Sequence, residues 1–226
     1  MSVTDTILSK TNRLTKQPEI SPGDHGFEMF NDAGTEVEVS EFLYSFVRMV
    51  KPDLILETGT HIGVSSTFMG LALKENKRGK LITFEIIPQH YENAPKLWAE
   101  VGVIEQVEGK LQDALQFDHF GLTFDILFLD SEPQLRFNEF LKFFDALRPG
   151  GFILIHDLHP SMGHSGQIVN GMYDWPYGDF REKLGPYLKE RKVQTIHFST
   201  PRGLTLFQKV DPNFEAEQYL SGASNV

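Results

Sequence analysis

Residues 54–66 read LILETGTHIGVSS, an apolar run that ends in a glycine-containing turn and then enters a helical pattern. Gly59 and Gly63 let the backbone turn tightly and approach a ligand, and the serines that follow open a helix whose N–H groups point outward. Ligands of open α/β sheets bind beyond the carboxyl ends of the strands. The stretch therefore predicts a strand, a ligand-binding turn and a helix.

Short apolar runs alternate with helical patterns on the carboxyl side of this turn. The predicted strands lie at 54–58, 81–86, 103–108, 124–130 and 152–156, and the predicted helices at 63–75, 89–101, 111–117 and 134–147. Strands separated by helices indicate a parallel sheet, because a parallel partner is reached only by a crossover. The runs at 193–200 and 203–210 have hairpin spacing instead. The sequence therefore predicts an α/β fold with a Rossmann-like, doubly wound, mostly parallel seven-stranded sheet and a terminal antiparallel hairpin.

One more helix is predicted ahead of the first strand. Thr35 and Glu38 have the spacing of a capping box, apolar residues recur after them at helical intervals, and Pro52 stops the pattern. Residues 1–34 are polar and interrupted by proline and glycine, so we expect an N-terminal arm or lid there. We expect the main domain at 35–210 and a tail at 211–226.

The composition narrows the class of function. The chain has 226 residues, with 31 acidic and 21 basic side chains, for a formal net charge of −10. This charge opposes the attraction that dominates nucleic-acid binding. There is no cysteine, so no disulfide, thiolate metal site or thiol nucleophile can form. The sequence shows no signal peptide and no membrane span, which favours a cytoplasmic protein that binds neither nucleic acid nor membrane.

Two acidic residues at strand ends bear on the choice of cofactor. Glu57 at the end of the first strand would repel a pyrophosphate but could anchor, directly or through water, the ammonium of a methionine moiety. Glu85 follows Gly63 by 22 residues and could accept hydrogen bonds from both ribose hydroxyls. The turn also lacks the three-glycine fingerprint of dinucleotide-binding proteins. A nicotinamide-dependent oxidoreductase, or a turn with no ligand, remains the alternative.

Five segments resemble, in order, the motifs of class I S-adenosylmethionine-dependent methyltransferases of the catechol O-methyltransferase-like group. They are ETGTHIGVSST (57–67), LITFEIIP (81–88), GKLQD (109–113), FDILFLD (124–130) and LRPGGFILIHD (147–157). The resemblance covers about residues 35–209, including the terminal hairpin. It implies an enzyme that binds S-adenosyl-L-methionine and methylates a small molecule.

The resemblance also implies a set of cofactor contacts. Glu57 and Ser65 would contact the methionine end, Glu85 the ribose, and Gln112 and Asp113 the adenine. The implied cofactor residues together are Glu57, Gly59, Thr60, His61, Gly63, Ser65, Glu85, Gln112, Asp113 and Asp130. For Asp113 a helix cap is the alternative, and for His61 a solvent-facing loop position.

Asp130 and Asp157 end adjacent strands of the predicted sheet, so both carboxylates should reach the cleft above the cofactor. Such a pair could hold Mg²⁺, which prefers oxygen ligands, and the catechol-type relatives use acidic residues at these positions. The sequence departs from that pattern at Leu158, where the relatives have Asn, and at Pro133, where they have Lys. The third metal ligand and the general base of that group are therefore missing.

Histidine could replace the missing base, because its pKa lies close to neutrality. His156, His159 and His164 fall within nine residues. His156 with Asp157 resembles the strand end of sugar and natural-product O-methyltransferases. His156 could also point into the core with a hydrogen-bond partner, so His159 is the preferred base or added ligand.

Residues 158–179 form a long connection after the fifth strand. Long connections in compact domains are often lids, and Tyr173, Trp175 and Tyr177 would give this one an aromatic wall over the acceptor. A homodimer contact, or a patch packed on the N-terminal arm, is the alternative. The sequence thus favours O-methylation of a small hydroxylated molecule, such as a phenol, sugar or natural product. A non-catalytic S-adenosylmethionine-binding relative and an N-methyltransferase are the other interpretations.

Overall fold

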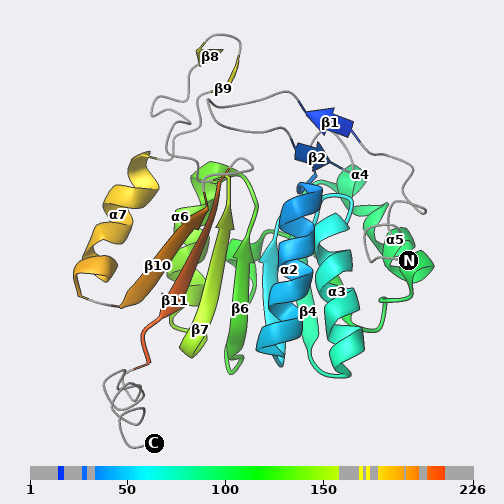
Figure 1. Cartoon of the computed structure of the whole chain (residues 1–226), viewed down its shortest axis with the longest axis horizontal. Helices are drawn as coiled ribbons and strands as arrows, with labels where there is room; N and C mark the ends of the chain where they lie inside the picture. The colour runs from blue at the N-terminus through cyan, green and yellow to red at the C-terminus, as the bar shows by residue number, and fades with distance from the viewer. Residues whose placement is uncertain are drawn as a thin grey trace, which may run out of the picture.

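The fold is an α/β sandwich around one seven-stranded sheet, seen in a computed structural model of the chain (Figure 1). The structure describes residues 15–17, 27–29, 34–157, 168–169, 172–173, 178–190, 192–198 and 203–211. The strands of the sheet are β3 (Leu54–Thr58), β4 (Lys80–Glu85), β5 (Val107–Leu111), β6 (Phe124–Leu129), β7 (Leu147–His156), β10 (Val193–Phe198) and β11 (Leu204–Lys209). Two short antiparallel pairs lie outside it, namely β1 (Thr15–Gln17) with β2 (Phe27–Met29) and β8 (Ile168–Val169) with β9 (Met172–Tyr173).

The strand order confirms the predicted topology. The order is β10-β11-β7-β6-β3-β4-β5, and the five strands from β3 to β7 are parallel. Strand β11 is antiparallel to both β7 and β10. The order reverses at β3, from which β4 lies to one side and β6 to the other. This is the point at which an open parallel sheet offers a crevice for a ligand.

Helices cover both faces of the sheet, because successive residues of a strand point to opposite sides. On β3, Ile55 packs in one hydrophobic cluster and Leu56 in the other. One cluster joins the sheet to α2 (Val37–Val50), α3 (Val64–Asn76) and α5 (Ala94–Val101), and the other to η1 (Ala114–Gln116), α6 (Pro133–Phe144) and α7 (Gly178–Lys189). In Figure 1, α2 and α3 lie side by side across one face.

Several predicted boundaries are wrong, two of them for local reasons. The helix predicted at 89–101 is two helices, α4 (Pro88–Tyr91) and α5, because Pro95 near the start of α5 has no N–H for a continuous helix. The strand predicted from 103 begins only at Val107. The backbone N–H of Val103 donates instead to the backbone carbonyl of Trp98, directly after Gly102, which has a left-handed conformation. The buried side chain of Val103 packs at the end of α5.

The strand predicted at 152–156 begins earlier, at Leu147, and the helix predicted to reach 147 ends at Phe144. Within the described residues, no helix is both long and apolar enough to cross a membrane. The predicted arm and tail fall largely outside the described residues, so those domain limits stay predictions.

Candidate functional site

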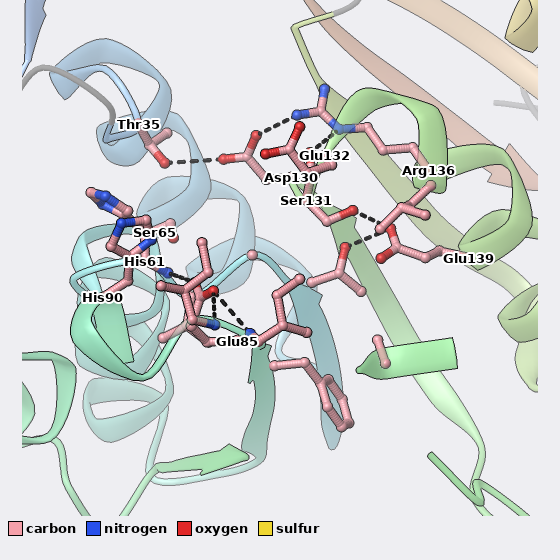
Figure 2. Close-up of a pocket in the computed structure, with 18 of the residues that line it drawn as sticks. Thr35, His61, Ser65, Glu85, His90, Asp130, Ser131, Glu132, Arg136 and Glu139 are labelled. Carbon is pink, nitrogen blue, oxygen red and sulfur yellow. Dashed lines mark hydrogen bonds and ion pairs between the residues drawn. The ribbon is translucent and has the colours of Figure 1, made fainter. Parts of the chain in front are cut away.

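A cavity of about 440 Å³ opens at the carboxyl ends of the parallel strands (Figure 2). The segments that follow the strands form its wall, at 58–62, 84–87, 112–114 and 130–133, together with Asp157. Gly34 and Thr35 add a wall from the segment before α2. Its size lies in the range of small-molecule and cofactor sites. The cavity lies at the carboxyl ends of the strands, where the sequence predicts a ligand site.

The turn between β3 and α3 depends on its glycines. Gly59 and Gly63 have φ angles of 87° and 85°, in the left-handed region that favours glycine. A Cβ on Gly59 would lie 2.3 Å from the backbone oxygen of Asp130. The backbone nitrogens of Gly59 and Thr60 both donate to the carbonyl of Phe84, at 3.0 Å. The turn is thus packed against the ends of β4 and β6.

Backbone donors orient the carboxylate of Glu85 at the edge of this cavity. Its Oε2 accepts from the N–H of His61 at 2.8 Å, and its Oε1 accepts from the N–H groups of Ile86 and Ile87 at 2.9 Å. Each oxygen of a carboxylate has two acceptor positions, so Oε2 can also accept from a ligand hydroxyl. The geometry is compatible with the predicted ribose contact.

Glu57 lies behind the cavity wall. Its side chain is fully buried, and the hydroxyl of Ser65, which does line the cavity, donates to its Oε1 at 2.5 Å. Its Oε2 has no hydrogen-bond partner among the described residues. Burial raises the pKa of Glu57 to about 8, although hydrogen bonds from Ser65 and Thr83 oppose the shift. The carboxyl group is therefore positioned to act on a ligand through or beside Ser65.

The remaining predicted cofactor residues also reach the cavity. Thr60, His61, Gln112 and Asp113 line it. His61 is not a solvent-facing loop residue, because it is more than half buried and its ring packs edge-on against His90, with the centroids 4.6 Å apart. Asp113 fits its alternative interpretation, since its Oδ1 accepts from the N–H of Leu115 and caps η1, and its contact with adenine stays a prediction.

The ends of β6 and β7 form a second, strongly charged part of the site. The Nδ1 of His156 lies 3.0 Å from Oδ1 of Asp130 and 3.6 Å from Oδ1 of Asp157. Its Nε2 lies 2.7 Å from Oε2 of Glu36 at the start of α2. Glu36, His156 and Asp157 also offer ligand atoms that lie within 4.8 Å of one another, a grouping that could hold a metal ion.

These carboxylates determine the protonation of His156. Burial alone would lower the pKa of its imidazole, but the charges of Asp157, Glu36 and Asp130 outweigh burial and raise the pKa to about 10. The side chain is only 1% exposed. The imidazole of His156 is therefore protonated on both nitrogens and positively charged at neutral pH. This fits the interpretation of a buried, hydrogen-bonded residue better than that of a free base.

Arg136, in the first turn of α6, was not predicted as a site residue. Its Nη2 lies 3.3 Å from Oδ1 of Asp130 and 3.2 Å from Oδ2 of Asp157. Figure 2 shows its guanidinium directed at Asp130, on the side opposite Thr35. A basic residue in the first turn of a helix is disfavoured by the helix dipole. The place of Arg136 in the first turn of a helix was therefore the feature of the sequence that could have indicated a special role.

The capping box predicted at Thr35 is wrong. The N-cap of α2 is Glu36, and no side chain caps the helix. The Thr35 hydroxyl donates instead to Oδ2 of Asp130, at 3.3 Å. The start of α2 is thereby joined to the end of β6, 95 residues away along the chain.

Several predicted residues cannot be placed. Leu158, His159 and His164 lie outside the described residues, as do Trp175 and Tyr177. The backbone of Tyr173 belongs to β9, but its side chain is not described. The base or ligand role of His159 and the aromatic lid therefore stay predictions.

The chain is similar in sequence to known methyltransferases. Residues 56–158 match a family model described as a methyltransferase domain. The chain is 27% identical over 130 residues to catechol O-methyltransferase domain-containing protein 1 of Mus musculus, covering 55% of this chain and 49% of that protein. It is 21% identical over 200 residues to caffeoyl-CoA O-methyltransferase 2 of Petunia hybrida, covering 80% and 78%. The chain thus spans about half the length of the first curated relatives it matches.

Two solved structures share the fold. The S-adenosylmethionine complex of the O-methyltransferase TomG of Streptomyces achromogenes has a TM-score of 0.63 and 24% identity, covering 79% of this chain and 82% of TomG. The S-adenosylhomocysteine-bound methyltransferase PaMTH1 of Podospora anserina has a TM-score of 0.68 and 17% identity, covering 92% and 95%.

Proposed function

We propose that this chain, given its similarity to catechol and caffeoyl-CoA O-methyltransferases, is a class I S-adenosylmethionine-dependent methyltransferase that transfers a methyl group from S-adenosylmethionine to an oxygen of a small hydroxylated molecule. The observation that carries the proposal is the pairing of Glu57 behind Ser65 with Glu85 beside the glycine turn. The buried carboxyl group of Glu57 and the oriented carboxylate of Glu85 lie at the carboxyl edge of the sheet. There they suit the ammonium and the ribose of the cofactor.

The same acidic groups argue against a dinucleotide. A pyrophosphate at the β3 turn would lie beside the carboxylate of Glu85 and be repelled by it, and the buried carboxyl of Glu57 offers it no positive charge. The S-adenosylmethionine molecule carries a sulfonium and an ammonium instead, so the negative charge of the site favours it. In the proposed pose the methionine end lies at Ser65, the ribose at Glu85 and the adenine near Gln112 and Asp113.

The acceptor would bind on the side of the cavity formed by Asp130, Ser131, Glu132 and Asp157. Methyl transfer from a sulfonium is an in-line displacement, in which the acceptor oxygen bonds to the methyl carbon as the carbon–sulfur bond breaks and S-adenosylhomocysteine leaves. The hydroxyl proton passes to a carboxylate of the site, Asp130 or Asp157. The protein has to align the acceptor oxygen with the methyl group and exclude water. Asp130 lies between the cofactor side and the acceptor side of the cavity, where it contacts Thr35, Arg136 and His156. It is the residue best placed to orient an acceptor.

Magnesium fits this pair of carboxylates poorly. Asp130 and Asp157 are the oxygen donors that Mg²⁺ prefers. However, one oxygen of each already faces the guanidinium of Arg136. The proposed reaction therefore uses only the residues of the chain, with no step assigned to a metal.

The test is a transfer assay with labelled S-adenosylmethionine and a panel of catechols, phenols, sugars and primary amines. We expect label in a hydroxylated acceptor, and at least about tenfold less with Asp130→Asn, since loss of an aligned charged contact costs more than 1.4 kcal/mol. Asp118→Asn, in an exposed loop, is the matched control. Label only in amines would indicate an N-methyltransferase. Cofactor binding with no transfer to any acceptor would indicate a non-catalytic relative.

A further inference from the structure

The guanidinium of Arg136 lies where the carboxylates of Asp130 and Asp157 approach each other. We propose that Arg136 is a positioning residue that takes the place of a divalent cation at the reaction centre, so that the centre binds no metal between these two carboxylates. The inference rests on the proposed function, because it concerns the acceptor side of the same cavity. It also differs from the Mg²⁺ prediction made from the sequence.

The guanidinium is fixed by more than the two carboxylates. Its Nε donates to the backbone carbonyl of Ser131 at 2.8 Å, and its Nη1 donates to the backbone carbonyl of His156. The side chain is 4% exposed. Because the arginine joins the backbone at the ends of both β6 and β7, it cannot leave the carboxylates without breaking these bonds.

The charge of Arg136 is permanent. The guanidinium stays protonated in proteins, and its planar array of donors matches carboxylate oxygens. A Mg²⁺ ion coordinates at about 2.0–2.1 Å from its oxygens. An ion on the same oxygens of Asp130 and Asp157 would therefore be an immediate neighbour of a buried positive charge. The repulsion is strong in a site with little water to screen it.

The backbone of Asp157 supports the same arrangement. Its φ angle is 55°, a left-handed conformation that is uncommon for a residue other than glycine. This conformation at the end of β7 accompanies the turn of the carboxylate toward Arg136, with Oδ2 at 3.2 Å from Nη2. An uncommon backbone conformation combined with a buried arginine indicates a preformed cation site that the chain fills itself.

The experiment measures metal binding separately from activity. Free Mn²⁺, which takes the same oxygen ligands as Mg²⁺, is titrated into the full chain saturated with S-adenosylhomocysteine and followed by electron paramagnetic resonance. We expect no Mn²⁺ bound by the wild type at about 100 µM. Arg136→Met removes the charge at similar length and should bind Mn²⁺ at least about tenfold more tightly, whereas Arg136→Lys keeps the charge and should resemble the wild type.

Two controls make every outcome informative. Arg78→Met removes an arginine from an exposed ion pair with Asp53 at the opposite end of the sheet and should leave Mn²⁺ binding unchanged. One equivalent of Mn²⁺ bound to the wild type and lost in both Asp130→Asn and Asp157→Asn would overturn the proposal, even if Arg136→Met fails to fold. An Arg136→Met protein that binds S-adenosylhomocysteine but no more Mn²⁺ than Arg78→Met would also overturn it.

The assay separates this proposal from the proposed function. Failure of the wild type to bind S-adenosylhomocysteine would contradict the proposed function alone, and the Mn²⁺ titration can then be made on the cofactor-free chain. Where transfer is observed, we expect the rate to change by less than about twofold on addition of a chelator, because no metal supports the charge of the site.

Discussion

The Nε2 of His156 lies 2.7 Å from Oε2 of Glu36, and both side chains are buried. This contact joins the last residue of β7 to the residue before α2, which are 120 positions apart. A buried imidazole between carboxylates has to be charged to satisfy them. The pair therefore links the protonation of the site to the stability of the fold.

The stability of the protein should fall at alkaline pH because of His156. Its pKa of about 10 in the folded chain exceeds the usual 6.5, so its contribution is complete below about pH 6.5 and is lost as the pH rises through 10. Urea unfolding at pH 6 to 10 should show a decline of up to about 5 kcal/mol, at about 1.4 kcal/mol per pKa unit, relative to His156→Gln. Parallel curves for the two proteins would contradict the assigned protonation.

Binding of S-adenosylhomocysteine should release a proton from Glu57. Burial raises its pKa to about 8, so the carboxyl is largely protonated at pH 7, and a ligand ammonium would favour the charged form. Titration calorimetry in buffers of different ionisation enthalpy should report nearly one proton released at pH 7. Glu57→Gln, which has the same shape but no proton to lose, should release none. Equal release by both proteins would locate the ionisation elsewhere.

Gly59→Ala should destabilise the fold and weaken cofactor binding. The added Cβ would lie 2.3 Å from the backbone oxygen of Asp130, which cannot move without displacing the end of β6. Gly121→Ala is the matched control, because Gly121 also has a positive φ, at 78°, but no atom within 4 Å of the new Cβ. We expect a loss of about 1–2 kcal/mol in the control and at least about 2 kcal/mol more at Gly59, measured by chemical unfolding. Similar losses would show that the close approach to Asp130 is not a constraint.

The sequence predicted the sheet because the alternation of buried residues and the spacing of turns are local properties. Ile55 and Leu56 on opposite faces, and glycines directly after a strand, are enough to place the cavity. The predicted start of β5 was wrong, because a buried residue such as Val103 after a helix end is indistinguishable in sequence from the first residue of a strand.

The charged half of the site depends on contacts that sequence spacing does not reveal. Thr35 has the spacing of a cap, yet its hydroxyl bonds to Asp130 across the fold. Arg136 was not predicted as a site residue, because its role depends on the carboxylates at two strand ends and the sequence signals it only by its place in the first turn of a helix. Both cases show tertiary contacts overriding a local pattern.

The most direct test of the central claim is calorimetric titration of the chain with S-adenosylhomocysteine and with NADH. We expect S-adenosylhomocysteine to bind with a Kd in the micromolar range and NADH not to bind at millimolar concentration. Glu85→Gln, which removes the charge that would accept the ribose hydroxyls in the proposed pose, should weaken the binding of S-adenosylhomocysteine at least about tenfold, while the exposed Glu108→Gln should not. Tight NADH binding without affinity for S-adenosylhomocysteine would contradict the account.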